Sequence, residues 1–535
     1  MNVAWTVGSF IVIVAAIWIY SYRKSRKEVN IETSEGYFMG GRSLGAVNVA
    51  GAIILTNLST DQLVGLNGQS YVTGMQVMAW EVTSAIAIVA LGLIFLPRYF
   101  KYGIDTIPDF LEMRYDTTIK RTISGMFIFT YVASFLPVLL YSGALVFNEI
   151  FHVDLMFGVP TIVAVVAICI IVGLVAIAYL LMGGLALTAH SDTLYSVGFL
   201  IGGLAVPILG LMFVGEGSFL RGIEFIVYDT PFNGLLNSIG AIDSQHVPWP
   251  TLFTGMLFNN LYFWCTNQMI VQKAFAAKSL KEAQKGTMIL GVYKIFGALF
   301  LVFPGVIARH MFGNQFLSHP DSSYPHMLVE LLPKALFGVY GAILLGSVLS
   351  SFAGALNSLV TLASLDFYKG VFNKKATDVQ VARSGKITTV VAGVLCISVA
   401  PFITYAPDGL YTFIQKFNGI YNIPLLILIL FAFWSKRATA YTAKIVFAVH
   451  IIMYGIATFF FSQINFLYIL SLLFFVEAFL MWVLPKVKGE GEFILDSFSS
   501  AKVDMEAWKH GKWVGALVIG VVLITYAFFS PWGIG

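Results

Sequence analysis

Long apolar segments recur along almost the whole chain, and they constrain its fold more than any other feature. A helix of about 20 apolar residues spans the hydrocarbon core of a bilayer, and about 14 runs of that order are present. They lie near residues 3–21, 45–71, 75–96, 122–148, 158–180, 191–214, 250–271, 287–309, 333–363, 387–404, 408–433, 441–461, 464–484 and 513–530. Only 11% of the residues are charged, whereas globular domains contain roughly 25%. The sequence therefore predicts an all-α integral membrane protein with about 14 transmembrane helices.

The positive charges are distributed unevenly between these runs. Alternate connecting segments hold 27 of the 32 Lys and Arg residues, at 22–42, 97–121, 273–285, 366–386, 435–444 and 485–512. Because Lys and Arg are enriched in cytoplasmic loops, we expect these segments in the cytoplasm and both termini outside it. We expect a multi-pass protein of the cell inner (plasma) membrane. The first run is followed by its positive charges rather than preceded by them, which favours a membrane helix over a cleaved signal peptide.

One polar stretch interrupts the apolar pattern early in the chain. Between Gly51 and Ser84, two apolar runs surround the sequence Thr56-Asn57-Leu58-Ser59-Thr60-Asp61-Gln62 and a lone Glu81. A polar group without a partner costs several kcal/mol at membrane depth. Such residues must therefore face water, an ion, a solute or one another. The stretch predicts a discontinuous helix at the centre of a secondary transporter.

Further polar residues interrupt the later runs. They are Asn259, Asn260, Tyr262, Trp264, Thr266, Asn267, Gln268, Lys294, Ser347, Ser350, Ser351, Asn357, Ser358, Gln415, Asn418 and Asn422. Polar groups in one early pair of helices and in several later ones are typical of two structural repeats that build one site at the midplane.

Other function classes lack their sequence signals. The three cysteines lie in apolar runs without metal-ligand spacing, and no GxxxxGK[ST] motif for ATP is present. Carboxylates and histidines do not cluster toward one interface, and a net charge of +4 does not indicate nucleic acid. We therefore expect neither an enzyme nor an organic cofactor. The expected partners are the lipid bilayer and a small solute.

Several stretches identify a family resemblance. They are GYFMGGRSLG, NLSTDQLVGLNGQ, TIPDFLEMRY, WCTNQMIVQKAFAAKSLKEAQKG and LNSLVTLASLDFYK. Through them, and over nearly its whole length, the chain resembles the sodium/solute symporter family, and most of all its bacterial sodium/sugar (sodium/galactose-type) cotransporters. The resemblance implies a LeuT-type core of five plus five inverted helices. The implied divisions are a leading helix and loop (1–43), a first repeat (44–215), a second repeat (216–435) and three trailing helices (436–535).

The resemblance also implies site residues. A sodium ion, the expected coupling ion, would be held by the carbonyls of Leu55, Leu58 and Ser347 and by the hydroxyls of Ser350 and Ser351. Oxygen ligands of this kind suit a hard cation. The sugar site would comprise Gln62, Glu81, Ser84, Asn260, Lys294 and Gln415. Asn57 would link the two sites, and Asp192 would mark the inner route of the ion or a second sodium site.

The implied gates differ from the family pattern at two places. The inner aromatic that stacks on the sugar is usually tyrosine, and here the position is Phe263, with Tyr262 beside it. The outer lid positions are Leu66, Trp80 and Tyr411, and Trp80 is bulkier than expected. These differences concern the identity of the sugar and leave the implied sodium site unaffected.

Plainer interpretations stand beside these assignments. Glu81 could pair with Lys294 as a structural ion pair, Ser350 and Ser351 could bond to carbonyls of their own helix, and Asp192 could cap a helix N-terminus. The leading functional hypothesis is sodium-coupled import of a monosaccharide. A polyol, uronate or sialic-acid-like anion is an alternative solute, and a membrane sensor or channel on a transporter scaffold is an alternative class.

Overall fold

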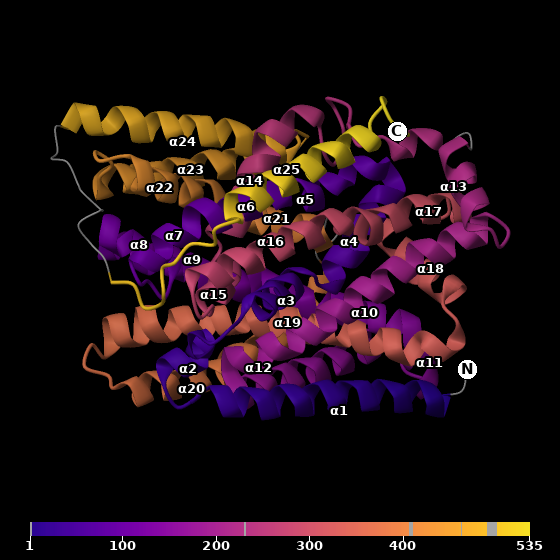
Figure 1. Ribbon diagram of the computed structural model, residues 1–535, viewed down its shortest axis with the longest axis horizontal. Helices are drawn as coiled ribbons and strands as arrows, with labels where there is room; N and C mark the ends of the chain where they lie inside the picture. Colours follow the sequence, from indigo (N-terminus) through magenta and orange to yellow (C-terminus); the bar gives the residue numbers. More distant parts are fainter. Residues whose placement is uncertain (1–2, 229–231, 406–409, 462, 489–499) are drawn as a thin grey trace.

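The protein is an elongated bundle of helices that run roughly along one common direction (Figure 1). The computed structural model describes residues 3–228, 232–405, 410–461, 463–488 and 500–535. Within these ranges there is no β-strand, only two isolated bridges. The expectation of an all-α protein is confirmed.

The helices follow one another closely along the chain. Their bounds are α1 (Val3–Glu28), α2 (Ser34–Met39), α3 (Ala46–Asn57), α4 (Thr60–Thr73), α5 (Ala79–Val82), α6 (Ser84–Ala90), α7 (Leu96–Lys101), α8 (Ile107–Arg114), α9 (Thr117–Thr130), α10 (Leu136–Phe151), α11 (Val153–Phe157), α12 (Thr161–Val214), α13 (Phe219–Tyr228), α14 (Gly255–Cys265), α15 (Gln268–Phe275), α16 (Leu280–Gly297), α17 (Phe303–Phe312), α18 (Ser323–Leu331), α19 (Phe337–Leu362), α20 (Asp378–Val399), α21 (Leu410–Asn418), α22 (Asn422–Trp434), α23 (Ala440–Phe460), α24 (Phe466–Lys488) and α25 (Gly511–Phe528). Short π-helical turns join α6 to α7 (Leu91–Phe95), α9 to α10 (Tyr131–Phe135) and α16 to α17 (Ala298–Val302).

Many of these helices have the length and composition of membrane spans. Ten helical segments in the described ranges are long and apolar enough to cross a membrane, and two shorter apolar helices, α3 and α22, accompany them. The longest segment, α12, has 54 residues, far more than the roughly 20 that one span needs. Gly184 divides it, because its φ of 54° and ψ of −149° are not helical. The two halves correspond to the apolar runs predicted at 158–180 and 191–214.

Three of the predicted apolar runs are broken helices. The run at 45–71 is α3 followed by α4, with Leu58 and Ser59 in extended conformation between them. The run at 250–271 is α14 followed by α15, where the Asn267 side chain accepts a bond from the main-chain N–H of Met269 and so caps α15. The run at 408–433 is α21 followed by α22. The predicted discontinuity at the early polar stretch is thus confirmed, and it is accompanied by two more.

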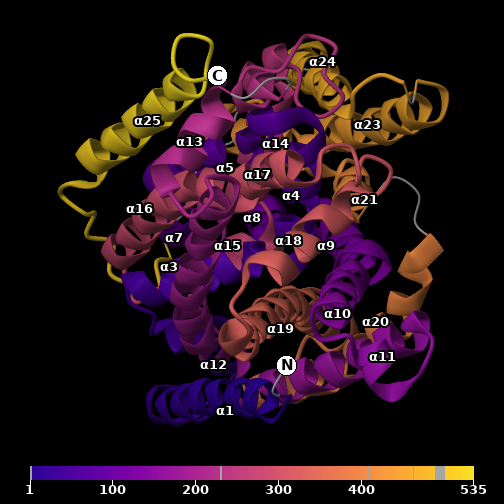
Figure 2. The ribbon, with the colours of Figure 1, turned by 90° about the vertical axis from the view of Figure 1, so that its right-hand side faces the viewer.

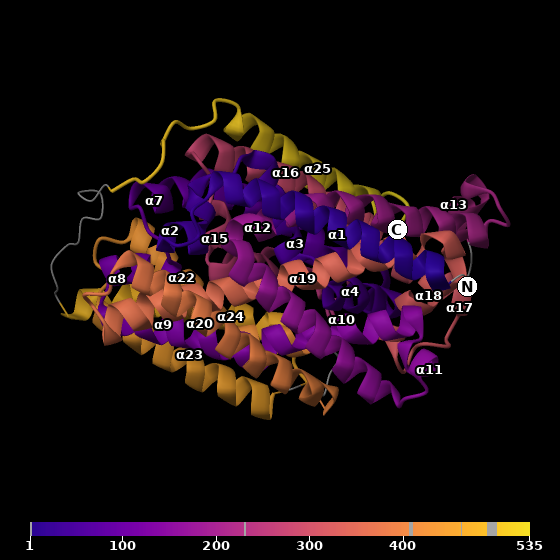
Figure 3. The same ribbon diagram turned by 90° about the horizontal axis from the view of Figure 1, so that it is seen from below.

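One part of each of two broken helices lies toward the middle of the bundle. In a view along the helices, α4 and α15 are central, whereas α1, α23 and α25 lie at the rim (Figure 2). The rim helices expose large apolar side chains such as Val12, Ile452 and Ile524. Such a surface is stable against lipid but not against water. The start of α1 and the end of α25 lie toward the same end of the bundle (Figure 3).

The packing of α4 against α17 yields a test of this arrangement. A Cβ at Gly305 of α17 would lie 2.1 Å from the main-chain oxygen of Asn67 on α4, whereas a Cβ at Gly455 of α23 would have no heavy atom within 4 Å. Overpacking of this kind typically costs about 1–3 kcal/mol. We expect Gly305→Ala to lower the apparent melting temperature of the purified protein, measured by size-exclusion chromatography after heating. Gly455→Ala is the matched control, and equal melting temperatures for the two variants would contradict the packing.

Candidate functional site

The break between α3 and α4 leaves main-chain carbonyls without helical partners. A helix normally satisfies each carbonyl with an N–H one turn further on, and the extended Leu58 and Ser59 end that pattern. The Ser351 hydroxyl of α19 donates to the Leu55 carbonyl at 2.6 Å and lies 3.5 Å from the Leu58 carbonyl. The structure therefore brings together the break and Ser351, which the family resemblance assigned jointly to sodium.

The other two serines of the predicted sodium set behave differently. The Ser347 hydroxyl donates to the Leu344 carbonyl of its own helix at 2.8 Å, so only its carbonyl is left for the role that the resemblance implies. The Ser350 hydroxyl is buried and faces the Asp192 carboxylate of α12. Oxygen ligands suit a hard cation, and this is the role that the resemblance implies for Ser350.

A small cavity of about 50 Å³ lies on the other side of the break. It is lined by Asn57, Ser59, Gln62, Trp80, Phe135, Asn259, Asn260, Phe263, Trp264, Lys294, Ile414, Gln415 and Asn418. These residues come from the break and the helix ends beside it, from α5, α14, α16 and α21, and from the π-helical turn between α9 and α10. The cavity brings together four of the predicted sugar residues, namely Gln62, Asn260, Lys294 and Gln415. Its volume admits only a few waters, so a solute requires its walls to move.

An ion pair lies at this cavity, with Lys294 in its wall and Glu81 outside the lining. Glu81 and Lys294 are both almost fully buried and form a salt bridge. Gln62 donates to Glu81 at 2.5 Å, and Lys294 also donates to the Asn57 side-chain oxygen at 2.7 Å. The Lys294 ammonium lies 5.2 Å from the centroid of the Trp264 ring. Lys294 therefore connects the break between α3 and α4 to Glu81.

Other predicted residues lie outside the cavity lining. The Ser84 hydroxyl donates to the Glu81 main-chain carbonyl at 2.5 Å, and Leu66 is buried in the apolar core. The Tyr262 hydroxyl accepts a bond from the Asn267 side chain at 3.2 Å, and its ring meets that of Tyr421 edge-on. The side chain of Tyr411 lies outside the described residues. Of the predicted gates, Phe263 and Trp80 line the cavity.

A much larger vestibule of about 910 Å³ lies beyond Trp80. Its walls include Gly65, Gln69, Val72, Asp243, His246, Asp321, Lys416 and Asn465. Trp80 and Gln415 line both the vestibule and the small cavity. The Trp80 indole stacks on Phe466 of α24, with centroids 6.1 Å apart and rings 8° from parallel. Trp80 and Gln415 therefore form the partition between vestibule and cavity.

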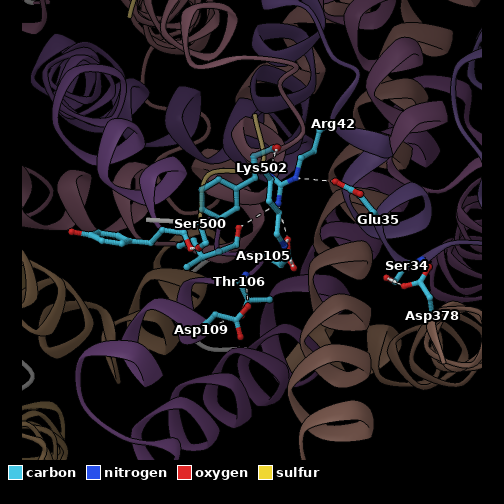
Figure 4. Close-up of polar contacts among 12 residues, drawn as sticks. Ser34, Glu35, Arg42, Asp105, Thr106, Asp109, Asp378, Ser500 and Lys502 are labelled. Atoms are coloured by element: carbon cyan, nitrogen blue, oxygen red, sulfur yellow. Dashed lines mark hydrogen bonds and ion pairs between the residues drawn. The ribbon is translucent and has the colours of Figure 1, made fainter. Parts of the chain in front are cut away.

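A polar cluster centred on Arg42 joins segments that are far apart in the sequence (Figure 4). The Arg42 guanidinium contacts Glu35 at 3.1 Å and Asp105 at 2.7 Å, and donates to the Phe275 carbonyl at 3.0 Å. Lys502 pairs with the same Asp105 at 2.7 Å. The cluster thereby ties together α2, the segment before α8, the end of α15 and the segment before α25. The sequence did not predict it, because its members are far apart along the chain.

Asp192 lies on α12, well inside the helix that restarts after Gly184. The interpretation of Asp192 as a helix N-cap is wrong, since several helical residues separate it from that break. Its nearest cation is Lys273, whose Nζ lies 3.9 Å from the Asp192 carboxylate. The charge pattern predicted Lys273 in a cytoplasmic loop, and the structure instead buries it in α15.

Several cavity residues were visible in the sequence but were not assigned to the site. Asn259, Trp264 and Asn418 interrupt apolar runs, and Ser59 belongs to the early polar stretch. Their signal was a polar or aromatic insertion, which does not say which face of the helix the side chain occupies. Only packing decides that.

Comparison with known proteins decides the family. A model of the sodium:solute symporter family matches residues 37–449. The chain belongs to the sodium:solute symporter family.

Individual relatives agree with this assignment. The uncharacterized symporter YidK of Escherichia coli (strain K12) is 40% identical over 527 residues, covering 98% of this chain and 90% of that protein. The sodium/glucose cotransporter of Vibrio parahaemolyticus is 27% identical over 451 residues, covering 80% of each. A Na⁺-coupled sialic acid symporter, solved in a substrate-bound outward-open state, shares the fold, with a TM-score of 0.76 and 19% identity over 90% of this chain and 97% of that one. These proteins are transporters, and the chain is likewise a membrane transporter and not an enzyme.

The partition of this transporter can be tested by chemical labelling. The three native cysteines are buried, so a cysteine introduced for Phe263 would report on access to the small cavity. We expect Trp80→Ala to speed the reaction of Phe263→Cys with a methanethiosulfonate reagent about tenfold or more, the effect of removing a barrier of roughly 1.4 kcal/mol. Val72→Cys, in the vestibule, is the control and should react at the same rate with and without Trp80. If Phe263→Cys reacts as fast as Val72→Cys in the presence of Trp80, the partition lies elsewhere.

Proposed function

We propose that the protein is a sodium-coupled symporter that imports a neutral polyhydroxylated solute, a monosaccharide of the glucose or galactose type, by alternating access. The observation that carries the proposal is the chemistry of the small cavity. Gln62, Asn260 and Gln415 each bring both hydrogen-bond donors and acceptors to it. A sugar hydroxyl is likewise both donor and acceptor, so the two sets match.

The electrostatic balance of the cavity supports a neutral solute. Among the described residues that line the cavity, Lys294 is the one with a formal charge, and Glu81 compensates it directly. A buried anion would have to compete with Glu81 for Lys294. The rings of Phe263, Trp264 and Trp80 add apolar faces, on which the C–H face of a sugar ring can pack.

Coupling would arise because the two sites share one structural element. The α3–α4 break supplies carbonyls toward Ser351 on one side and Asn57, Ser59 and Gln62 to the cavity on the other. A sodium ion that fixes the break would also fix these side chains. Binding of either ligand would then favour binding of the other by the same factor.

The proposed architecture has 14 spans with a LeuT-type core in segments 44–215 and 216–435. Its support is that each half contains a broken helix, α3–α4 in the first and α14–α15 in the second. We also propose that both termini are extracytoplasmic. In support, α1 carries Arg26 and Lys27 in its last turn, at the end of the bundle opposite to its start.

An anionic solute is the alternative that a specific observation favours. Lys294 lines the cavity, and a carboxylate on the solute could take the place of Glu81 beside it. The structural relative with a sialic acid substrate belongs to this category. A channel is less favoured, since Trp80 and Gln415 lie between the small cavity and the vestibule.

The proposal is tested by uptake into proteoliposomes that contain the purified protein. Radiolabelled hexoses, inositol, a hexuronate and sialic acid are supplied with an inward sodium gradient, and again with potassium in place of sodium. We expect accumulation of at least one neutral sugar only under the sodium gradient. Accumulation that is equal in both salts would contradict sodium coupling.

Ser351 provides a prediction for the ion step. Removal of its hydroxyl would take away one contact to the break, and the loss of such a contact typically costs about 1–3 kcal/mol, or roughly ten- to a hundredfold in affinity. We expect Ser351→Ala to raise the sodium concentration for half-maximal uptake by such a factor. Ser358→Ala on the same helix is the control, because that hydroxyl donates to the Gly354 carbonyl within α19. An unchanged sodium dependence of Ser351→Ala would refute the proposed ion site.

Glu81 provides a prediction for solute charge. With Glu81→Gln, Lys294 loses its compensating charge and Gln62 loses its charged acceptor. A neutral sugar should then bind more weakly, by about tenfold or more, while sodium binding stays nearly unchanged. An anionic solute should instead bind more tightly, because its carboxylate would compensate Lys294.

The measurement is the inhibition constant of glucose and of glucuronate on wild type and on Glu81→Gln. Ser84→Ala is the control, because the Ser84 hydroxyl donates to the main-chain carbonyl of Glu81 and Ser84 does not line the cavity. Suppose that Glu81→Gln lowers the inhibition constant of glucuronate and leaves that of glucose unchanged. This result would exclude the monosaccharide proposal and would leave the sodium-symporter assignment intact.

A further inference from the structure

Asp192 is a fully buried carboxylate on α12. The groups that face it include the Lys273 ammonium and the Ser350 hydroxyl of α19. A buried carboxylate is costly unless a positive charge compensates it. A cation close to Asp192 would lower this cost.

Lys273 is the cation that the structure places there. Its Nζ lies 3.9 Å from the Asp192 carboxylate and 3.4 Å from the Thr188 hydroxyl. The Lys273 side chain is only 1% exposed, so its charge cannot be compensated by water. It belongs to α15, the helix that follows the break after α14. Each member of the pair is thus the counter-charge that the other needs.

This pair is adjacent to the proposed sodium site. The Ser350 hydroxyl of α19 is among the groups that face the Asp192 carboxylate. The next residue of α12, Thr193, makes a close approach to α3, where a Cβ on Gly51 would lie 2.6 Å from its Cα. Asp192 is about 12 Å along the helix from Gly184, at 1.5 Å per residue. A sodium ion that left Ser350 toward that end of α12 would therefore meet Asp192 and Lys273 together.

We infer that the Lys273 ammonium is the fixed counter-cation of Asp192, so that this transporter couples one sodium ion rather than two. The inference rests on the proposed sodium-coupled function and specifies its stoichiometry. A second sodium at Asp192 would share one carboxylate with an ammonium about 4 Å away, in a region from which water is excluded. Like charges repel strongly in such surroundings. Lys273 excludes the second ion by charge and leaves the first, at Ser351, unaffected.

The test counts sodium ions bound to the purified protein and needs no solute. Binding of ²²Na⁺ is measured by scintillation proximity, with potassium as the competing background and with the fraction of active protein calibrated. Wild type should bind one sodium per chain. Lys273→Met should bind two sodium ions per chain. It is measured at alkaline pH so that a proton does not bind Asp192 in place of the second sodium. Lys273→Arg should bind one sodium ion per chain.

A second variant keeps the test decisive if Lys273→Met does not fold. The pair variant Asp192→Asn with Lys273→Met removes both charges together and should still bind one sodium, with an affinity within about twofold of wild type. Two sodium ions in wild type, one in folded Lys273→Met, or a more than about tenfold weaker affinity in the pair variant would each overturn the inference. Absence of any sodium-specific binding in wild type would instead refute the proposed sodium coupling itself.

Discussion

The structure depends on what happens to main-chain polar groups where a helix stops inside a membrane. In lipid, a helix can be interrupted only where side chains, water or an ion satisfy the carbonyl and amide groups that the interruption frees. At Leu58 and Ser59 the interruption is complete, and the Ser351 hydroxyl on α19 satisfies one of the freed carbonyls. Under the proposed function, a sodium ion would lie beside the remaining oxygen atoms. The break is a cost to the fold, and it would also hold the coupling ion.

The second requirement is that charges buried near the break cancel locally. Glu81 with Lys294 and Asp192 with Lys273 are two acid–base pairs, each almost entirely inaccessible to water. In each pair, one partner belongs to a helix of the first half of the chain and the other to a helix of the second half. Breaking either pair during a conformational change would expose an uncompensated charge to a poorly polarisable interior. The helices that carry each pair are therefore expected to move as one body.

The sequence alone was sufficient for the fold class and for the position of the first break. A dense polar stretch between apolar runs is stable in a membrane only beside water, an ion, a solute or other polar groups, and the same reasoning located the polar insertions in α14, α19 and α21. Reasoning from the sequence failed where a residue's role depends on the direction in which its side chain points. Ser84 and Gln62 are equally polar in the sequence, yet only Gln62 lines the cavity. Lys273 was misassigned because its neighbours look like a charged loop, and only the folded chain shows that α15 carries it inward.

The Arg42 cluster has a consequence for the ion gradient across the membrane. Its members come from four separate segments that share one guanidinium and one carboxylate (Figure 4). Contacts that share partners are energetically coupled, so the loss of one weakens the others. The cluster is therefore expected to break cooperatively. If it closes one end of the transport path in the proposed function, cooperative opening would limit the passage of sodium without solute.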